Sequence, residues 1–147
     1  MINIDQSSFQ FLNLIREDIM QLSKQDLSAL QGTWEQVALE VDGISNPPDQ
    51  YGNPGVLTTF SGNHFAVRTT DGVLLLEGTF RLNAAAIPKA IDYVDFMGPD
   101  KGKLLLAIYA LEGDHFQFTA ADPGDPRPTT FRAGLKQTMR AFVRKRD

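Results

Sequence analysis

Hydrophobic residues along this chain follow two different periods, and the period changes near residue 31. Ser7 with Gln10, and again Ser23 with Asp26, resembles a helix N-cap with its reciprocal partner three residues later. Two helical pieces are therefore predicted, the second of them ended by Gly32. Apolar side chains recur at helical spacing along the first piece, at Phe11, Ile15, Ile19 and Leu22.

From Gly32 onward, apolar and polar residues alternate with the period of two that half-buried strands show. Asp71-Gly72 predicts a tight two-residue hairpin, because both central positions of a type I′ turn need a positive φ. No segment long enough to be a crossover helix separates the apolar runs, which excludes a parallel βαβ sheet and favours a meander. The strand-like runs are Thr33–Val41, Val56–Phe60, His64–Thr70, Val73–Leu82, Ala90–Phe96, Lys103–Leu111, His115–Ala120, Thr129–Phe131 and Gln137–Lys145.

About eight strands in one meander either close into a barrel or form two packed sheets. Closure removes the exposed sheet edges, so it is the favoured solution. The predicted fold is mainly β: an antiparallel up-and-down barrel of about eight strands with an N-terminal α-helical extension. The predicted organisation is a helical extension over residues 1–30 and a barrel over residues 31–147.

The first strand contains an inconsistency. Trp34 shares one face with polar Gln36, whereas apolar Val37 and Leu39 lie on the other face. Either a β-bulge after Trp34 exchanges the two faces, or the apolar outer face is covered by another element. The helix Ser8 to Leu22 is the expected cover, packed on the outside of the barrel or across a mouth, and a second protomer is the alternative.

Gly32-Thr33-Trp34, preceded by a short helix, resembles the lipocalin opening motif. The chain from Leu30 to Arg146 is also similar to an uncharacterised family of bacterial lipocalin-like domains. The resemblance implies a calycin-type barrel, with Trp34 packed at its closed base, and no activity. It also implies a basic residue of the last strand over the indole ring, for which Arg144 is the candidate and Arg140 and Arg146 are alternatives. The similarity rests on motifs that include Glu40-Val41-Asp42-Gly43, Glu77-Gly78-Thr79-Phe80, Pro88-Lys89-Ala90-Ile91-Asp92 and Arg127-Pro128-Thr129.

Composition restricts the class of protein and partner. The chain has 147 residues, enough for one domain with a hydrophobic core, and a net charge of −4, which argues against non-specific nucleic-acid binding. It has no cysteine, which excludes disulfides and thiolate chemistry. No apolar run approaches the roughly 18 residues of a transmembrane segment. The N-terminus lacks the basic region of a signal peptide, so a cytoplasmic location is expected, although a chain that has lost a leader would look the same.

No sequence pattern indicates catalysis, a metal site or a cofactor. His64 and His115 both follow turn residues and are expected at the surface. The chain has neither a Gly-x-Ser-x-Gly elbow nor a phosphate-binding loop. Asp92 and Asp95 lie three residues apart on a strand, so they point to opposite faces and cannot act on one bond. We therefore expect no catalytic residue, no metal and no cofactor; an enzyme with a polar calyx is the third-ranked class.

Aromatic residues, present on nearly every predicted strand, carry the functional hypothesis. The interior of an eight-stranded barrel is either filled by side chains or just wide enough for one small ligand. The leading hypothesis is non-enzymatic binding of a small apolar or amphipathic molecule in a shallow calyx, which needs a cavity of about 300 Å³ or more. The alternative is a filled barrel that binds a protein partner or a second copy through the N-terminal helix and the loops 46–55 and 122–130.

The calyx candidates combine inward aromatic residues with charged ones that would select a polar head group. Glu77 would hold such a group, together with Arg68 or Arg81, if its side chain points inward. The alternative for Glu77 is a cross-strand pair on the barrel exterior. The candidates are Phe65, Arg68, Glu77, Phe80, Arg81, Tyr109 and Phe118.

Overall fold

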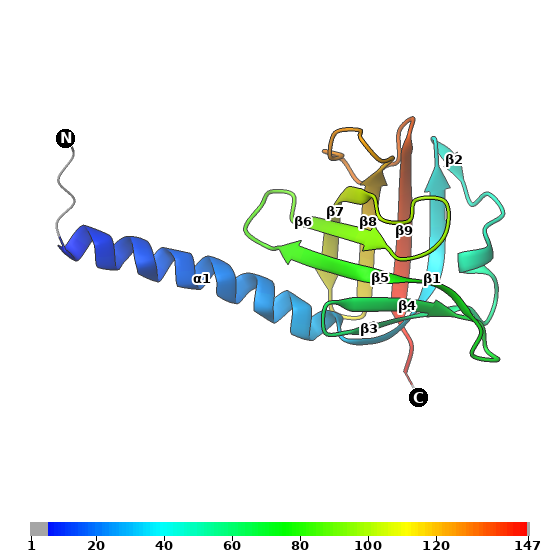
Figure 1. The fold of residues 1–147 in the computed structure, drawn as a ribbon, viewed down its shortest axis with the longest axis horizontal. Coiled ribbons are helices and arrows are strands. Elements are labelled where there is room, and N and C mark those ends of the chain that lie inside the picture. The colour runs from blue at the N-terminus through cyan, green and yellow to red at the C-terminus, as the bar shows by residue number, and fades with distance from the viewer. Residues whose placement is uncertain (1–5, 147) are drawn as a thin grey trace.

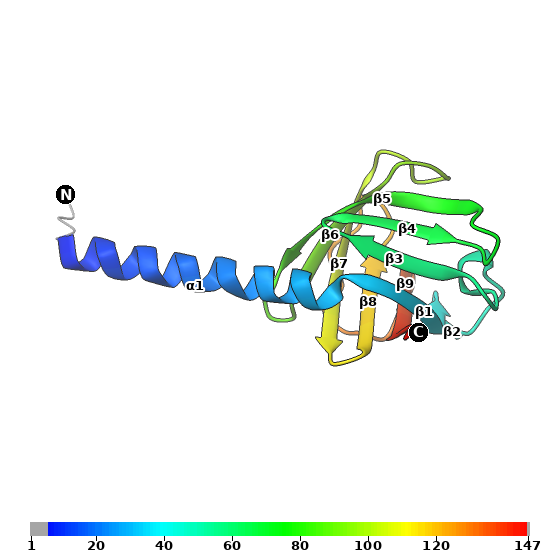
Figure 2. The same cartoon turned by 90° about the horizontal axis from the view of Figure 1, so that it is seen from below.

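The computed structural model describes residues 6–146 and shows a closed antiparallel barrel with one long helix projecting from it (Figures 1 and 2). Eight strands pair in the order β1-β3-β4-β5-β6-β7-β8-β9, and pairing of β9 with β1 closes the barrel. The predicted up-and-down barrel with a helical extension is thereby confirmed. The elements are α1 (Gln6–Leu30), β1 (Gly32–Val41), β2 (Ile44–Ser45), the 3₁₀ turn η1 (Gln50–Gly52), β3 (Leu57–Ser61), β4 (His64–Arg68), β5 (Leu74–Asn83), β6 (Ala90–Asp95), β7 (Leu104–Glu112), β8 (His115–Ala121) and β9 (Gln137–Arg144).

A β-bulge in β1 accounts for the inconsistent parity of this strand. Gln36 lies opposite Phe142 of β9, and the next pair joins Ala38 to Ala141. Val37 is therefore the extra residue, and its side chain is exposed. Beyond it Leu39 is buried, as the alternation after a one-residue shift requires.

Two local predictions were wrong. The β4–β5 connection spans five residues, 69–73, and Gly72 is the only residue in it with a positive φ, 85°. A two-residue type I′ turn is therefore absent there, because it would need a second positive φ at Asp71. The run Thr129–Phe131 is not a strand but part of the irregular β8–β9 connection, where the Phe131 carbonyl accepts a hydrogen bond from Thr119 Oγ1 at 2.6 Å.

One end of the barrel is filled by side chains around Trp34, which is fully buried. The indole Nε1 donates a hydrogen bond to the Leu30 carbonyl at 2.8 Å. The Arg144 guanidinium lies over the ring, with its carbon 4.3 Å from the ring centroid. Arg144 Nη1 also donates to the Gln31 carbonyl at 2.8 Å, so the cation–π contact joins β9 to β1 and the hydrogen bond joins β9 to the residue that follows α1.

The helix differs from the prediction in both continuity and position. It is one helix rather than two, because Ser23 and Asp26 do not cap a new helix but bind the barrel. Ser23 Oγ accepts a hydrogen bond from the Ala84 amide at 3.0 Å, and Asp26 accepts one from the Tyr109 hydroxyl at 2.6 Å. Residues 6–22 extend away from the barrel, so they cover neither its outer wall nor its mouth (Figures 1 and 2). No helix within residues 6–146 is long and apolar enough to cross a membrane.

Candidate ligand-binding site

A cavity of about 250 Å³ lies inside the barrel, at the end opposite α1. The α1 end is formed by the β3–β4, β5–β6 and β7–β8 connections, and Leu30 and Trp34 fill it. The other end is formed by the η1 segment and the β6–β7 and β8–β9 connections. Tyr51, Asp100 and Asp122 line the cavity from these three segments. The barrel is thus closed at the helix end and hollow at the other.

The inner wall of this cavity is mainly aromatic. Tyr93 packs edge-on against Phe65 at 6.2 Å and against Phe118 at 5.8 Å between ring centroids, an arrangement that fixes the rings. Aliphatic side chains from β4, β5, β6, β7 and β8 complete the wall. The apolar lining consists of Phe60, Phe65, Val67, Leu76, Phe80, Ile91, Leu105, Phe116, Phe118, Ala120, Ala121 and Phe142.

One side of the mouth carries a guanidinium whose charge is already paired. Arg140, from β9, donates through Nη1 to Gln36 Oε1 at 2.9 Å and forms an ion pair with Asp49. Its guanidinium carbon also lies 5.4 Å from the centroid of the Tyr51 ring. Asp49 is held in turn by the Tyr51 amide, which donates to Oδ1 at 3.1 Å. This network fixes Arg140 in place and neutralises it.

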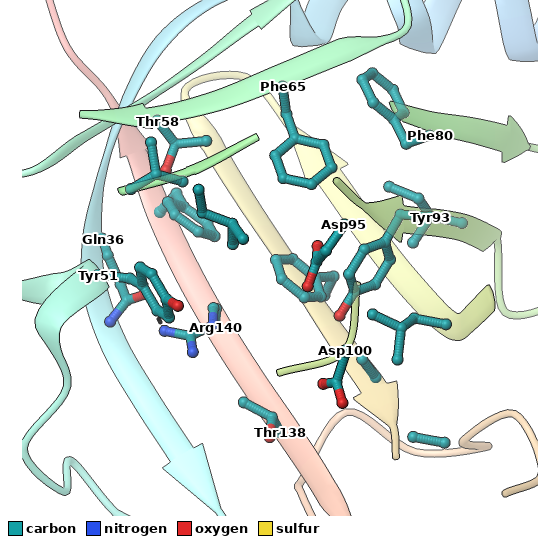
Figure 3. A pocket seen from close by; sticks show the side chains of 18 of the residues that line it. Gln36, Tyr51, Thr58, Phe65, Phe80, Tyr93, Asp95, Asp100, Thr138 and Arg140 are labelled. Atoms are coloured by element: carbon teal, nitrogen blue, oxygen red, sulfur yellow. Dashed lines mark hydrogen bonds between the residues drawn. The ribbon is translucent and has the colours of Figure 1, made fainter. Parts of the chain in front are cut away.

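The opposite side of the mouth carries Tyr93 and Asp95, at the end of β6, and Asp100 in the following connection (Figure 3). Tyr93 and Asp95 are two residues apart on one strand, so both point inward. Asp95 Oδ1 is buried and has no hydrogen-bond partner within residues 6–146. Burial raises the pKa of Asp95 to about 6, Asp100 adds to the rise and Arg140 opposes it. Burial also raises the pKa of Tyr93, and the Asp95 carboxylate adds to that effect.

The structure brings together three of the seven calyx candidates. Phe65, Phe80 and Phe118 line the cavity. Tyr109 is buried in the aromatic core at the helix end, where its hydroxyl binds Asp26. Burial and this hydrogen bond raise the pKa of Tyr109.

The three charged candidates lie outside the cavity. Glu77 pairs with His64 across two neighbouring strands, at 3.3 Å between Oε2 and Nε2. Arg81 is 85% exposed and lies 3.7 Å from Asp92, and Arg68 is exposed. Glu77 therefore takes the exterior cross-strand position that the sequence left open.

Sequence reasoning missed the polar groups of the mouth. Asp95 could have been found, because it shares its strand parity with Tyr93 and with buried Ile91. Arg140 was considered only as a partner for Trp34. Its place in the cavity depends on Gln36, which lies on the same strand face as Trp34, and on the η1 turn, which brings Asp49 and Tyr51 over the mouth.

Comparisons with protein-family models, with curated proteins and with solved structures give no match to this chain. Any inference about function therefore starts from the geometry of the chain itself. It consists of a barrel cavity that is open at one end, apolar inside and polar at its rim.

Proposed function

We propose that this protein binds a small apolar or amphipathic molecule in the barrel cavity and does not transform it. The observation that carries the proposal is the 250 Å³ cavity, which has an apolar interior and a few convergent polar groups at its mouth. Most ligand pockets have this composition. The volume lies just below the roughly 300 Å³ at which such pockets begin, so the ligand is small.

The size and lining of the cavity indicate the body of the ligand. An apolar engineered cavity of about 150 Å³ accepts one benzene ring, so about 250 Å³ corresponds to two fused rings or an equivalent short chain. Edge and face contacts with the surrounding phenylalanine rings favour a flat aromatic body. A lipid with a long acyl chain does not fit this volume.

Native mass spectrometry of the purified protein, without added ligand, tests the proposal. We expect a reproducible excess mass that is lost on denaturation. The matched control is Ala120→Leu, which adds three carbon atoms to a buried residue of the cavity wall and is expected to reduce or remove that excess mass. A wild-type protein that shows no excess mass, and that takes up no two-ring compound when one is added, would overturn the proposal.

A second candidate function is association with a second copy of the chain through α1. Large apolar side chains of its projecting part are exposed, Phe11 by 63% and Leu22 by 47%. Leu12, Ile15, Ile19 and Leu22 follow the three-four-three spacing that forms the seam of a two-helix coiled coil. Such a seam is complementary to itself, so a second copy fits it without any further assumption.

Light scattering coupled to size-exclusion chromatography tests this association. We expect a dimer for the wild type and a monomer for the double variant Ile15→Glu/Ile19→Glu, because it places charges inside the seam. The matched control, Gln10→Glu/Gln21→Glu, adds the same charge to the opposite face of α1 and is expected to remain a dimer. A wild type that stays monomeric at high protein concentration would exclude this function.

A further inference from the structure

Asp95 is the polar group of the cavity that the protein itself does not satisfy. Its Oδ1 is buried without a hydrogen bond within the described part of the chain, and Figure 3 shows the carboxyl directed into the cavity. Asp92, on the outer face of the same strand, also has a buried Oδ1 without a hydrogen bond, but the Arg127 guanidinium compensates its charge, with Nη2 2.6 Å from this oxygen. A buried carboxylate oxygen without a donor is costly, so the structure favours a ligand that brings one.

The charges around the cavity have one predominant sign. Three acidic residues, Asp95, Asp100 and Asp122, and one basic residue, Arg140, line the cavity. The charge of Arg140 is already compensated by Asp49, which lies behind it. Glu77, on the neighbouring strand β5, points outward to His64 and contributes no group to the cavity. A bound cation is therefore attracted to this mouth, and a bound anion is repelled.

We infer that the ligand is an amine with a small aromatic or aliphatic body: its protonated nitrogen donates a hydrogen bond to Asp95 Oδ1, and its body fills the aromatic cavity. This rests on the proposed function, since it assigns a ligand class to the same cavity. Tyr93 lies beside Asp95, so its ring offers the ammonium group a cation–π contact in addition to the hydrogen bond.

The raised pKa of Asp95 supports this assignment and gives it a pH dependence. At a pKa of about 6 the side chain is ionised at pH 7.5 and mostly protonated at pH 5. Of the other groups facing it, Asp100 raises this pKa and Arg140 lowers it. The affinity for an amine is therefore expected to rise as the pH increases from 5 to 7.5. The affinity for an uncharged analogue is expected to stay constant.

Isothermal titration calorimetry with three probes that share one body tests the inference. The probes are 2-(1-naphthyl)ethylamine, 2-(1-naphthyl)ethanol and 1-naphthylacetate, which differ only in a cationic, a neutral or an anionic head group. At pH 7.5 we expect the amine to bind about tenfold or more tightly than the alcohol, as a hydrogen bond between charged groups contributes. The carboxylate is expected to bind most weakly of the three.

Three variants separate this inference from the proposed function. Asp95→Asn is expected to remove the preference for the amine and to leave the alcohol affinity unchanged. Asp92→Asn makes the same charge change on the outer face of the same strand and is expected to retain the preference. Ala120→Leu is expected to lower the affinity for all three probes. Such a loss would show that the probes occupy the cavity and not the exposed face of α1.

The remaining outcomes are also decisive. Equal affinities for all three probes, or a preference for the amine that survives in Asp95→Asn, would overturn the inference while the proposed function stands. Tightest binding of the carboxylate would overturn it in favour of an anionic ligand. No binding of any probe to the wild type would reject both the inference and the proposed function.

Discussion

At the scale of single residues, the Asp95 carboxylate that faces the cavity lowers the stability of the native state. An unpaired carboxyl that is partly buried favours its protonated form, which is why burial raises its pKa from 3.8 to about 6. In the unfolded chain the same group ionises at its ordinary pKa. The native state therefore binds more protons than the unfolded state between these two pH values, and its stability falls as the pH rises through this window.

Replacing Asp95 by Asn is expected to raise the free energy of unfolding above pH 6 by about 1–2 kcal/mol, after allowance for solvent screening of a group that is only half buried. The gain shrinks as the pH falls from 6 toward 4 and vanishes below about 3.8, where both states of the wild type protonate Asp95. Urea denaturation of both proteins between pH 4 and 7 measures their free energies of unfolding. Other titrating groups contribute equally to both proteins, so their contribution cancels in the difference. A constant difference across that range would contradict the assigned environment.

Arg144 is the residue that joins three parts of the closed base. Its guanidinium covers Trp34, donates to the Gln31 carbonyl at the end of α1 and pairs with Asp114, at 3.1 Å between Nε and Oδ1. Arg146 donates to the same carboxylate, with Nη2 2.7 Å from Oδ1, and the hydrogen bonds from Arg146 and Arg144 lower the pKa of Asp114. Arg144 Nη2 also donates to the Ala29 carbonyl, so one side chain combines a cation–π contact with three charge-assisted hydrogen bonds.

Arg144→Met is expected to cost roughly 2–4 kcal/mol of stability, because it removes the cation and leaves the helix-end carbonyl without its donor. Arg144→Lys is expected to lie between this variant and the wild type, since lysine keeps the charge but lacks the planar fork. Trp34 is the only tryptophan, so its fluorescence reports unfolding of the base directly. Equal stabilities for Arg144→Met and the wild type would show that the contact contributes nothing.

At the scale of elements, α1 consists of two parts with different surroundings. Its last two turns are anchored, because Asp26 accepts hydrogen bonds from the Tyr109 hydroxyl and from Lys89 Nζ at 2.6 and 2.9 Å. Leu27 and Leu30 pack against the aromatic core. The preceding turns project from the barrel and carry exposed apolar side chains, so burial against the barrel does little to stabilise them.

Asp26→Ala is expected to speed hydrogen exchange of the amides in residues 23–30 by about 5- to 100-fold, because it removes both bonds that hold this segment. The strands of the barrel should exchange as in the wild type. Hydrogen–deuterium exchange followed by mass spectrometry of peptides measures both. Asp18→Ala, an acidic residue of the projecting part, serves as the control; an equal effect of the two changes would exclude the anchoring role of Asp26.

The sequence predicted those elements that depend on local pattern. The alternation of apolar residues, the scarcity of long connections and the need to protect sheet edges were enough for the closed barrel. The bulge at Val37 was also anticipated as one of two alternatives, from the parity of Trp34 and Leu39. The continuity of α1 was not, because Ser23 and Asp26 have the form of a cap and only tertiary contacts show that they bind Ala84 and Tyr109 instead.

At the scale of the whole molecule, α1 closes one end of the barrel and the proposed binding cavity lies at the other end. The end of α1 fills one end of the barrel, and the unfilled volume is at the other, below a rim formed by β6, β9 and η1. Aromatic composition alone could not predict this division, since the same rings suit a filled and a hollow barrel. The exposed apolar face of α1 is a second surface on which a small apolar molecule could gather.

The most direct test of the central claim is therefore to locate a bound two-ring compound by NMR, through intermolecular NOEs between 2-(1-naphthyl)ethanol and assigned methyl groups. We expect NOEs to Val67, Leu105 and Ala120, whose side chains line the cavity. NOEs confined to Ile15 and Ile19 of the projecting helix would contradict a ligand site in the barrel.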